Sequence, residues 1–504
     1  MLEFRHAGKD MKRASGAFVL LRNTRVLEPL PDVLGGVPLW LDTARRCSVA
    51  LFMVIACGLA APSLFAGPIL NLAPGISGVV TTWATGLNYP VGMVLAPDGS
   101  LLVGTTAPLG GQSGDVPYYQ GAGTILSFAG PNSPGTVVAG PFPGAITSIV
   151  RAGSNYLVVG TAGNGEVTPP GDRSSFTTMD MHVMVKNGAT YTEIGDIHVD
   201  QNPSNSVNPA FTVVPHPGGG PNQFDLYFQV GSAEYLPEPL ANAPVTGLIN
   251  GQLQQGAIYR VTLTGNGNSA SAGPVTQIAT GVRNSFGMAL DANGNLYFGD
   301  NGNETSADTL NIIPGAATVN SPLDFGFPSS YYDGLTGILN NSYPGRQATL
   351  LAFAGATPQS GISNLALAPS AFPNPYHGGI FIAFHGNYFN ANAANLENAL
   401  LYYDPVTNST SAFIPAAQAS VGNLDGLLST SDSLFVADFG TGPGNFVPGT
   451  GAIYQIGLSQ DSSTPEPAAF VLACIGLAAL TVRAWFRRRR RHAPCEGPAC
   501  NLLM

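Results

Sequence analysis

A short turn–strand phrase that recurs six times is the feature that most constrains the fold. Each copy is a turn of Asp, Asn, Gly or Ser, followed by a short apolar strand that ends in Gly or Asp. The clearest copy is Asn293-Gly294-Asn295 before Leu296-Tyr297-Phe298-Gly299-Asp300. The strands begin near residues 101, 156, 226, 296, 380 and 434. Since no helical periodicity lies between them, the repeats predict an all-β, six-bladed β-propeller over residues 67–460. A β-sandwich array is the alternative.

A second phrase places glycine before a short apolar strand, at Gly123, Gly256 and Gly451. We expect it to be the strand that carries the chain out of each unit. Glycine and proline total 63 and 41 residues, so turns interrupt the chain at short intervals, as a propeller requires.

The N-terminal residues 1–66 are predicted to be a leader. Arg45 and Arg46 precede an apolar core at residues 47–61, and small residues follow up to Ala66. This order is typical of a signal peptide, whose helix is cleaved after export. Cys57 lies in a loose lipoprotein box, which is the alternative interpretation.

The C-terminus predicts a transmembrane helix. An apolar run covers residues 468–482 and five arginines follow at 487–491. Lys and Arg hold the end that carries them in the cytoplasm, so we expect residues 492–504 to be a cytoplasmic tail and the propeller to lie outside. The order Pro465-Glu466-Pro467, apolar helix and arginine cluster, over residues 464–491, resembles the PEP-CTERM sorting signal. That resemblance implies processing by an exosortase-type membrane peptidase and association with exopolysaccharide at the cell envelope. A plain anchor helix is the alternative.

Charge limits the partners of the exported part. Residues 67–463 hold six Lys and Arg against 23 Asp and Glu, a formal charge of −17. Such a surface repels phosphate backbones, so we expect no nucleic-acid binding. Carboxylate oxygens suit calcium. All five cysteines lie at the chain ends, so no disulfide is expected in the propeller.

One central block is more specific than a generic propeller. The segments are Thr280–Asp291, with Arg283-Asn284 inside it, Asp300–Asn303, Asp308–Ile313 and Asp324–Pro328. Together they resemble the glucose/sorbosone dehydrogenase family, whose members are six-bladed, calcium-dependent propellers that use pyrroloquinoline quinone (PQQ).

The resemblance implies a role for each matching residue. Arg283 and Asn284 would lie at the PQQ and substrate pocket as cofactor-binding and catalytic residues. Gly302, Asn303 and Asp308 would form the calcium loop. His216, in a His-Pro-Gly-Gly phrase, would be the general base that takes the proton from a sugar hydroxyl. Only nine residues separate His216 from Leu226, fewer than the family pattern has.

Two function classes stay open. One is a PQQ- and calcium-dependent sugar dehydrogenase that acts on extracellular carbohydrate. The other is a non-catalytic propeller that binds glycans or proteins and is associated with exopolysaccharide. Arg346 is the only Lys or Arg between residues 284 and 482, which leaves few cations for an anionic quinone and favours the second class, whereas the block around Arg283 favours the first. A lactonase-type hydrolase is the third candidate.

Overall fold

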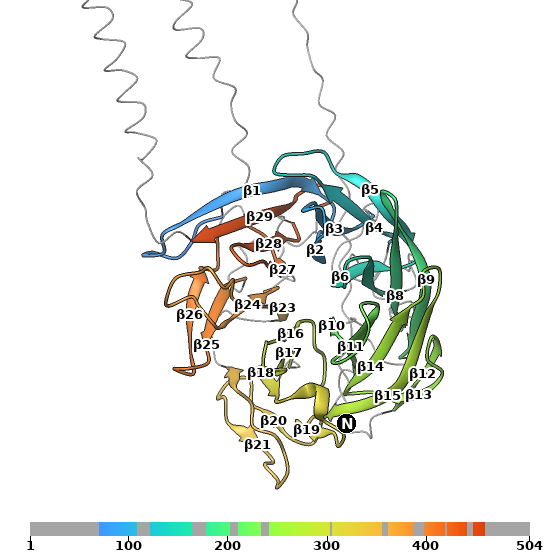
Figure 1. The fold of residues 1–504 in the computed structure, drawn as a ribbon. Helices are drawn as coiled ribbons and strands as arrows, with labels where there is room; N and C mark the ends of the chain where they lie inside the picture. The colour runs from blue at the N-terminus through green and yellow to red at the C-terminus, as the bar shows by residue number, and fades with distance from the viewer. Residues whose placement is uncertain are drawn as a thin grey trace, which may run out of the picture. The chain divides into compact units, whose positions relative to one another are not determined.

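The computed structural model describes ten segments of the chain (Figure 1): residues 70–107, 121–163, 178–201, 210–232, 241–302, 305–354, 361–386, 398–418, 421–440 and 447–458. The predicted signal peptide and the predicted sorting signal, with Pro465, Glu466 and Pro467, lie outside the described residues. None of the helical structure in the described segments is long and apolar enough to cross a membrane.

Six sheets of at least four strands each form the blades. The strands of each blade are given from the innermost to the outermost. Blade 1 consists of β2 (Met93–Leu95), β3 (Leu101–Thr106), β4 (Gly123–Phe128) and β5 (Thr136–Phe142), and blade 2 of β6 (Ala145–Ala152), β7 (Tyr156–Ala162), β8 (Thr178–Asn187) and β9 (Thr190–Asp200). Blade 3 consists of β10 (Phe211–Pro215), β11 (Gln223–Val230), β14 (Ala257–Gly265) and β15 (Ala270–Thr280).

Blades 4 to 6 continue the ring. Blade 4 consists of β16 (Met288–Leu290), β17 (Leu296–Asp300), β18 (Asp308–Ile313) and β22 (Leu351–Phe353), and blade 5 of β23 (Ile362–Leu367), β24 (Ile380–Phe384), β25 (Leu400–Asp404) and β26 (Ser409–Ile414). Blade 6 consists of β27 (Leu424–Ser429), β28 (Leu434–Asp438), β29 (Gly451–Leu458) and β1 (Gly78–Leu87).

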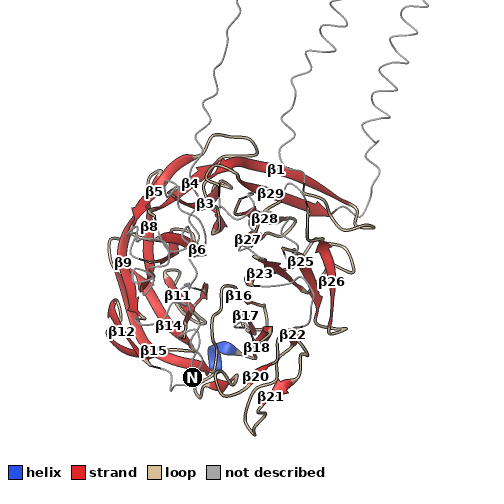
Figure 2. Cartoon of the chain, turned by 180° about the vertical axis from the view of Figure 1, so that it is seen from behind, coloured by secondary structure: helices blue, strands red, loops and turns tan. Residues whose placement is uncertain are grey.

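The ring closes through the first strand of the chain. β1 completes blade 6 by pairing antiparallel with β29, from Gly78 opposite Leu458 to Leu87 opposite Gly451. The inner strands contact one another in sequence, and β27 of blade 6 returns to contact β2 of blade 1 (Figures 1 and 2). The prediction of an all-β, six-bladed propeller is therefore confirmed.

The recurring phrase forms the second strand of every blade. These strands, β3, β7, β11, β17, β24 and β28, are almost entirely buried, because sheets cover both of their faces. The prediction for the second phrase was wrong for Gly123 and Gly256: their strands, β4 and β14, are third in their blades and are followed by the outer strands β5 and β15. It was right for Gly451, because the outer strand of blade 6 is β1 and the described chain leaves that blade through β29.

Further short strands lie outside the four-stranded blades. β12 (Asn242–Gly247) and β13 (Gly251–Gln254) come from the connection between β11 and β14, yet they pair onto β9 and extend blade 2. β19 (Leu323–Asp324) adds to β15, and β20 (Tyr331–Tyr332) pairs with β21 (Leu339–Asn340). A short 3-10 helix, η2 (Ala316–Thr318), is the helical element of the described residues (Figure 2).

The strand directions give the ring two distinct rims. Because each blade is antiparallel, the loop that leads into an inner strand lies at the same rim as the connection from the second strand to the third. We call this the inlet rim; in blade 4 it comprises residues 281–287, 301–302 and 305–307. The opposite rim, formed by turns such as residues 216–222, is called the turn rim.

Candidate functional site

The structure brings four of the predicted site residues together at the inlet rim of blade 4. Arg283 and Asn284 precede β16, and Asp300 ends the neighbouring strand β17. The Asp300 carboxylate accepts the backbone N–H of Asn284 at 2.7 Å and that of Arg283 at 3.1 Å. Asp300 therefore fixes the loop that presents both predicted residues.

The Arg283 side chain points to the loop that was predicted to hold calcium. Its Nη1 donates to the carbonyl oxygen of Asn301 at 2.8 Å and to that of Gly302 at 2.5 Å. Arg283 is only 6% exposed. A guanidinium stays protonated in proteins, so a permanent positive charge lies against the carbonyl group that the resemblance assigned to the metal.

Asp308 closes the same loop. Its Oδ1 accepts the N–H of Gly302 at 2.8 Å, and its Oδ2 accepts the N–H of Gly361, which leads into blade 5, at 2.6 Å. A Cβ atom at Gly302 would overlap the backbone of Ser306, which explains the glycine there. Asn303 lies outside the described residues.

Burial dominates the electrostatics of both carboxylates. Desolvation raises the pKa of Asp300 to about 6, while hydrogen bonds from the backbone of Asn284 and Arg283 and the charge of Arg283 oppose that rise. Asp308 has its pKa raised to about 6 by the same cause, opposed by the N–H groups of Gly302 and Gly361 and by Arg283. Arg283 is thus the counter-charge for two buried carboxyl groups.

The space beside Arg283 is small. A cavity of about 30 Å³ lies among residues of blade 4 and the 325–349 connection, and it has room for a water molecule. Its polar and aromatic lining includes Arg283, Asn311, Tyr331, Tyr332, Arg346 and Thr349. Ligand pockets usually measure roughly 300 to 1,000 Å³, so a quinone does not fit this cavity as it stands.

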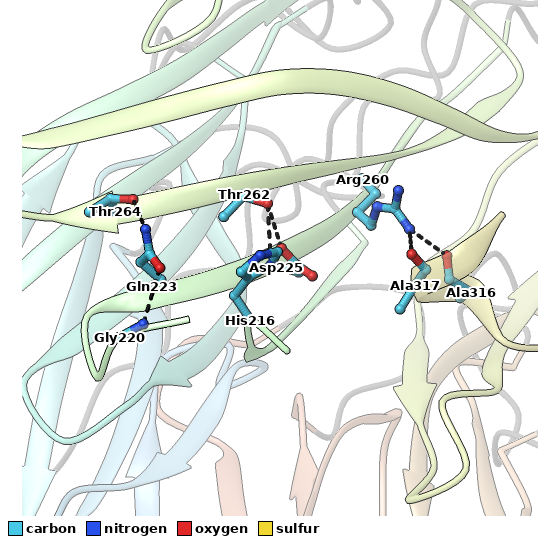
Figure 3. A network of polar contacts seen from close by, with 9 residues as sticks. All are labelled: His216, Gly220, Gln223, Asp225, Arg260, Thr262, Thr264, Ala316 and Ala317. Carbon is cyan, nitrogen blue, oxygen red and sulfur yellow. Dashed lines mark hydrogen bonds and ion pairs between the residues drawn. The ribbon is translucent and has the colours of Figure 1, made fainter. Parts of the chain in front are cut away.

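The other cations of the propeller are engaged as well. Of the six Lys and Arg in residues 67–463, five lie in described segments, and each donates a hydrogen bond to a protein oxygen. Arg260, for example, donates to the carbonyl oxygens of Ala316 and Ala317 in η2 (Figure 3). An anionic cofactor would have to compete with these contacts.

His216 does not join this site. It follows β10 in the turn that leads to β11, and its N–H bonds to Gln223 at the start of β11. The backbone of Arg283 instead accepts hydrogen bonds from Gln229 and Ser232, at the end of β11. An eight-residue strand spans roughly 25 Å, so His216 lies at the turn rim and Arg283 at the inlet rim.

The surroundings of His216 form a local network (Figure 3). Its Nδ1 lies 2.8 Å from Oδ1 of Asp225, which also accepts the Thr262 hydroxyl at 2.7 Å. The three residues come from the first three strands and turns of blade 3, so the contacts fasten neighbouring strands. The geometry therefore does not unite the predicted set of His216, Arg283 and Asn284 in one pocket.

A polar network that the sequence did not reveal continues from blade 4 to blade 6. Gly361, which binds Asp308, accepts the N–H of His385 at 2.8 Å. The His385 Nδ1 lies 2.7 Å from Asp425, and its Nε2 lies 2.9 Å from the Asn423 amide. Both ring nitrogens have partners within the fold, so this histidine links the blades. Its partners are 38 and 40 residues away, which a linear pattern cannot show.

A second and larger concavity lies at the outer edge of blades 2 and 3. It has a volume of about 660 Å³ between the β12–β13 hairpin and strands β14 and β15, which lie side by side in Figures 1 and 2. None of its lining residues is charged. Five of them carry carboxamides: Asn242, Asn250, Gln252, Gln254 and Gln277. We call this the carboxamide cleft.

The carboxamide cleft is built on packed strands. The Gln277 Nε2 on β15 donates to Oε1 of Gln254 on β13 at 3.0 Å. The Tyr259 hydroxyl donates to the backbone oxygen of Gln254 at 2.9 Å. Leu248, Pro274 and Val275, which are partly or fully exposed, give part of the surface an apolar character. The run Gly251-Gln252-Leu253-Gln254 alternates as an edge strand does, but only the fold brings Gln277 beside it.

Comparison with known proteins gave structural matches alone: no family model and no curated protein matches the chain. The PQQ-bound aldose sugar dehydrogenase of Streptomyces coelicolor is 18% identical, with a TM-score of 0.47, and the match covers 77% of this chain and 100% of that one. A putative glucose dehydrogenase of Thermus thermophilus is 16% identical, with a TM-score of 0.46, and the match covers 75% of this chain and 99% of that one. The PQQ domain of pyranose dehydrogenase from Coprinopsis cinerea is 15% identical, with a TM-score of 0.48, and the match covers 77% of this chain and 97% of that one. Such values assign neither a family nor an activity, and the six-bladed fold rests on the strand pairing itself.

Proposed function

We propose that this chain is an exported propeller, held at the cell envelope, that binds neutral carbohydrate. Its function would then be recognition of extracellular glycan, such as an exopolysaccharide, by a scaffold that resembles sugar dehydrogenases. The leader with its apolar core at residues 47–61 supports export. The order of Pro465-Glu466-Pro467, apolar run and Arg487–Arg491 supports retention in the inner membrane and processing by an exosortase-type peptidase.

The observation that carries the proposal is the carboxamide cleft. A carboxamide both donates and accepts hydrogen bonds, as a sugar hydroxyl does, so a row of them can match a glycan without any charge. The domain has a formal charge of −17, yet the cleft has no charged lining residue. A neutral ligand would lose no ionic solvation on entering it, whereas an acidic glycan would be repelled by the surrounding field.

The size and the surface of the cleft fit the same ligand class. A volume of about 660 Å³ lies within the range of small-ligand sites. The accessible apolar side chains of Leu248 and Val275 could pack against the C–H faces of a pyranose ring, while the amides of Asn242 and Gln252, both exposed, reach its hydroxyls.

Affinity electrophoresis of the full-length protein in detergent tests the proposal. We expect neutral glucans or galactans in the gel to slow its migration and polyuronates to have no such effect. Gln277→Ala and Gln252→Ala should release it. Gln455→Ala is the matched control, because Gln455 also makes one side-chain hydrogen bond, to Ser433 at 3.0 Å, but lies on blade 6. Equal migration of the wild type with and without every neutral glycan contradicts the proposal.

A PQQ-dependent sugar dehydrogenase is the second candidate, and one observation favours it. Arg283, Asn284, Gly302 and Asp308 lie together at the inlet rim, as the resemblance implies. The contact of Arg283 with Gly302, the small cavity and the remote His216 weigh against it. Calorimetric titration with PQQ, with and without calcium, separates the candidates: binding of PQQ at micromolar concentration would favour the enzyme.

A further inference from the structure

Oxygen atoms gather at the inlet rim of blade 4 in a way that demands a cation. The carbonyl groups of Asn301 and Gly302 face Arg283, and the carboxylates of Asp300 and Asp308 bind the adjoining backbone. Such a set of hard oxygen atoms is what a divalent cation such as calcium prefers.

Two residues of this rim also carry buried amide oxygens. Oδ1 of Asn284 and Oδ1 of Asn301 are buried and have no hydrogen-bond partner among the described residues. Asn284 itself is only 9% exposed. Buried acceptors of this kind are costly unless a donor or a cation compensates them.

The cation that the described structure contains at this position is Arg283. One nitrogen, Nη1, contacts both carbonyl oxygens, and the charge of the guanidinium lowers the cost of ionising both Asp300 and Asp308. A divalent ion on the same carbonyl oxygens would lie against Nη1, where charge repulsion in a buried site is strong. The residues present therefore do not fit a calcium ion while Arg283 keeps this position.

We infer that Arg283 is a built-in cation that replaces a divalent metal at this loop. The guanidinium is covalently attached and cannot be removed by a chelator, so the loop of Asn301 and Gly302 keeps its conformation at any calcium concentration. Arg283 is thus a structural residue whose removal exposes a latent calcium site. This inference is independent of the carboxamide cleft, which lies on other blades.

Thermal unfolding of the full-length protein in detergent tests the inference, with calcium chloride as the probe and magnesium chloride as the control for ionic strength. We expect the wild-type midpoint to be the same in calcium and in EDTA. Arg283→Met should lower the midpoint in EDTA, because two buried carboxyl groups lose their counter-charge, and calcium should restore most of that loss. Arg283→Lys keeps a positive charge, although as a point charge on a shorter side chain. Its stability should therefore stay insensitive to calcium.

Calorimetric titration with calcium gives the matching binding result. Arg283→Met should bind calcium at its new site, with one more ion per chain than the wild type. The inference fails if calcium stabilises the wild type and that effect disappears in Arg283→Met, because Arg283 would then support a metal rather than replace it. If Arg283→Met unfolds in EDTA, refolding in calcium supports the inference, and failure to refold in calcium overturns it.

Discussion

Blades 4 and 6 use the same strand phrase and the same carboxylate position, but only blade 4 supplies a cation. Asp300 ends β17 and Asp438 ends β28, and each binds the backbone that leads into its own inner strand. Asp300 faces Arg283. Asp438 instead has Asp425 nearby, and its pKa is raised to about 7, first by burial and then also by that second carboxylate, against hydrogen bonds from Gly422 and Gly440.

The carboxylate is common to these two blades and the arginine is not. The second strands of blades 1, 2, 3 and 5 end instead in Thr106, Ala162, Val230 and Phe384. In blades 4 and 6 the carboxyl group satisfies N–H groups that the sheet leaves unpaired. Blade 4 therefore differs from blade 6 by the guanidinium that faces its carboxylate and contacts the carbonyl oxygens of Asn301 and Gly302.

The largest difference between the blades should follow asparagine substitution of each aspartate. The two carboxylate oxygens of Asp300 accept from different N–H groups, so in Asp300→Asn the new NH₂ group faces one of these backbone donors. The substitution also removes a negative charge that faces the Arg283 guanidinium. We expect a loss of about 3 kcal/mol in unfolding free energy. In Asp438, Oδ1 accepts from both Gly422 and Gly440, and Oδ2 only shares the Gly422 N–H, so an asparagine can keep its oxygen toward both glycines and Asp438→Asn should cost about 1 kcal/mol. Urea unfolding at pH 6 measures both.

Equal losses in the two variants would contradict this comparison, because they would mean that neither Arg283 nor the division of acceptors between two oxygens matters. Asn293→Ala, in an exposed turn of blade 4, is a control for substitutions that leave the rim intact.

The repeated phrase made the fold predictable because it encodes the most buried element of each blade. Leu296-Tyr297-Phe298 and its counterparts must be apolar on both faces, and the turns before them need Asp, Asn or Gly. The strands after Gly123 and Gly256 were assigned to the wrong place in their blades, because the sequence does not show whether one more strand pairs outside them. Closure of the ring by β1 depends on pairing across almost the whole chain, which no local signal shows.

The candidate site was predictable in its position but not in its contacts. The resemblance placed Arg283, Asn284, Gly302 and Asp308 near one another, and the fold does so. The direction of the Arg283 side chain depends on which oxygens lie within its reach, and these come from the β17–β18 connection, 18 and 19 residues further along the chain. The carboxamide cleft could not be predicted from the sequence, because Gln277 and Gln254 lie 23 residues apart on different strands.

The pH dependence of stability should sharpen the comparison further. Because the pKa of Asp438 is raised to about 7 in the folded protein and is near 4 in the unfolded chain, its contribution is complete below about pH 4 and is lost as the pH rises through 7. Asparagine does not titrate. From pH 5 to pH 8 we expect the stability of Asp438→Asn to rise relative to the wild type by about 2 kcal/mol.

Urea midpoints of both proteins at each pH give this difference, and the other carboxyl groups cancel in the subtraction. At pH 8 the variant should be the more stable of the two. A difference that does not change between pH 5 and pH 8 would show that Asp438 is already ionised in the folded protein at low pH.

The smallest effect should come from the second arginine of blade 4, Arg346. It lies 5.2 Å from the centre of the Tyr332 ring and donates to the carbonyl oxygen of Gln347, but it is partly exposed. Arg346→Met keeps the aliphatic stem and removes a cation–π contact, which is worth about 0.5 to 1 kcal/mol at such sites. We therefore expect a small loss of stability and no response to calcium, in contrast to Arg283→Met. If Arg346→Met destabilised the protein as much as Arg283→Met, charge near the cavity would matter more than the contact with the buried carbonyl oxygens, and Arg283 would lose its special role.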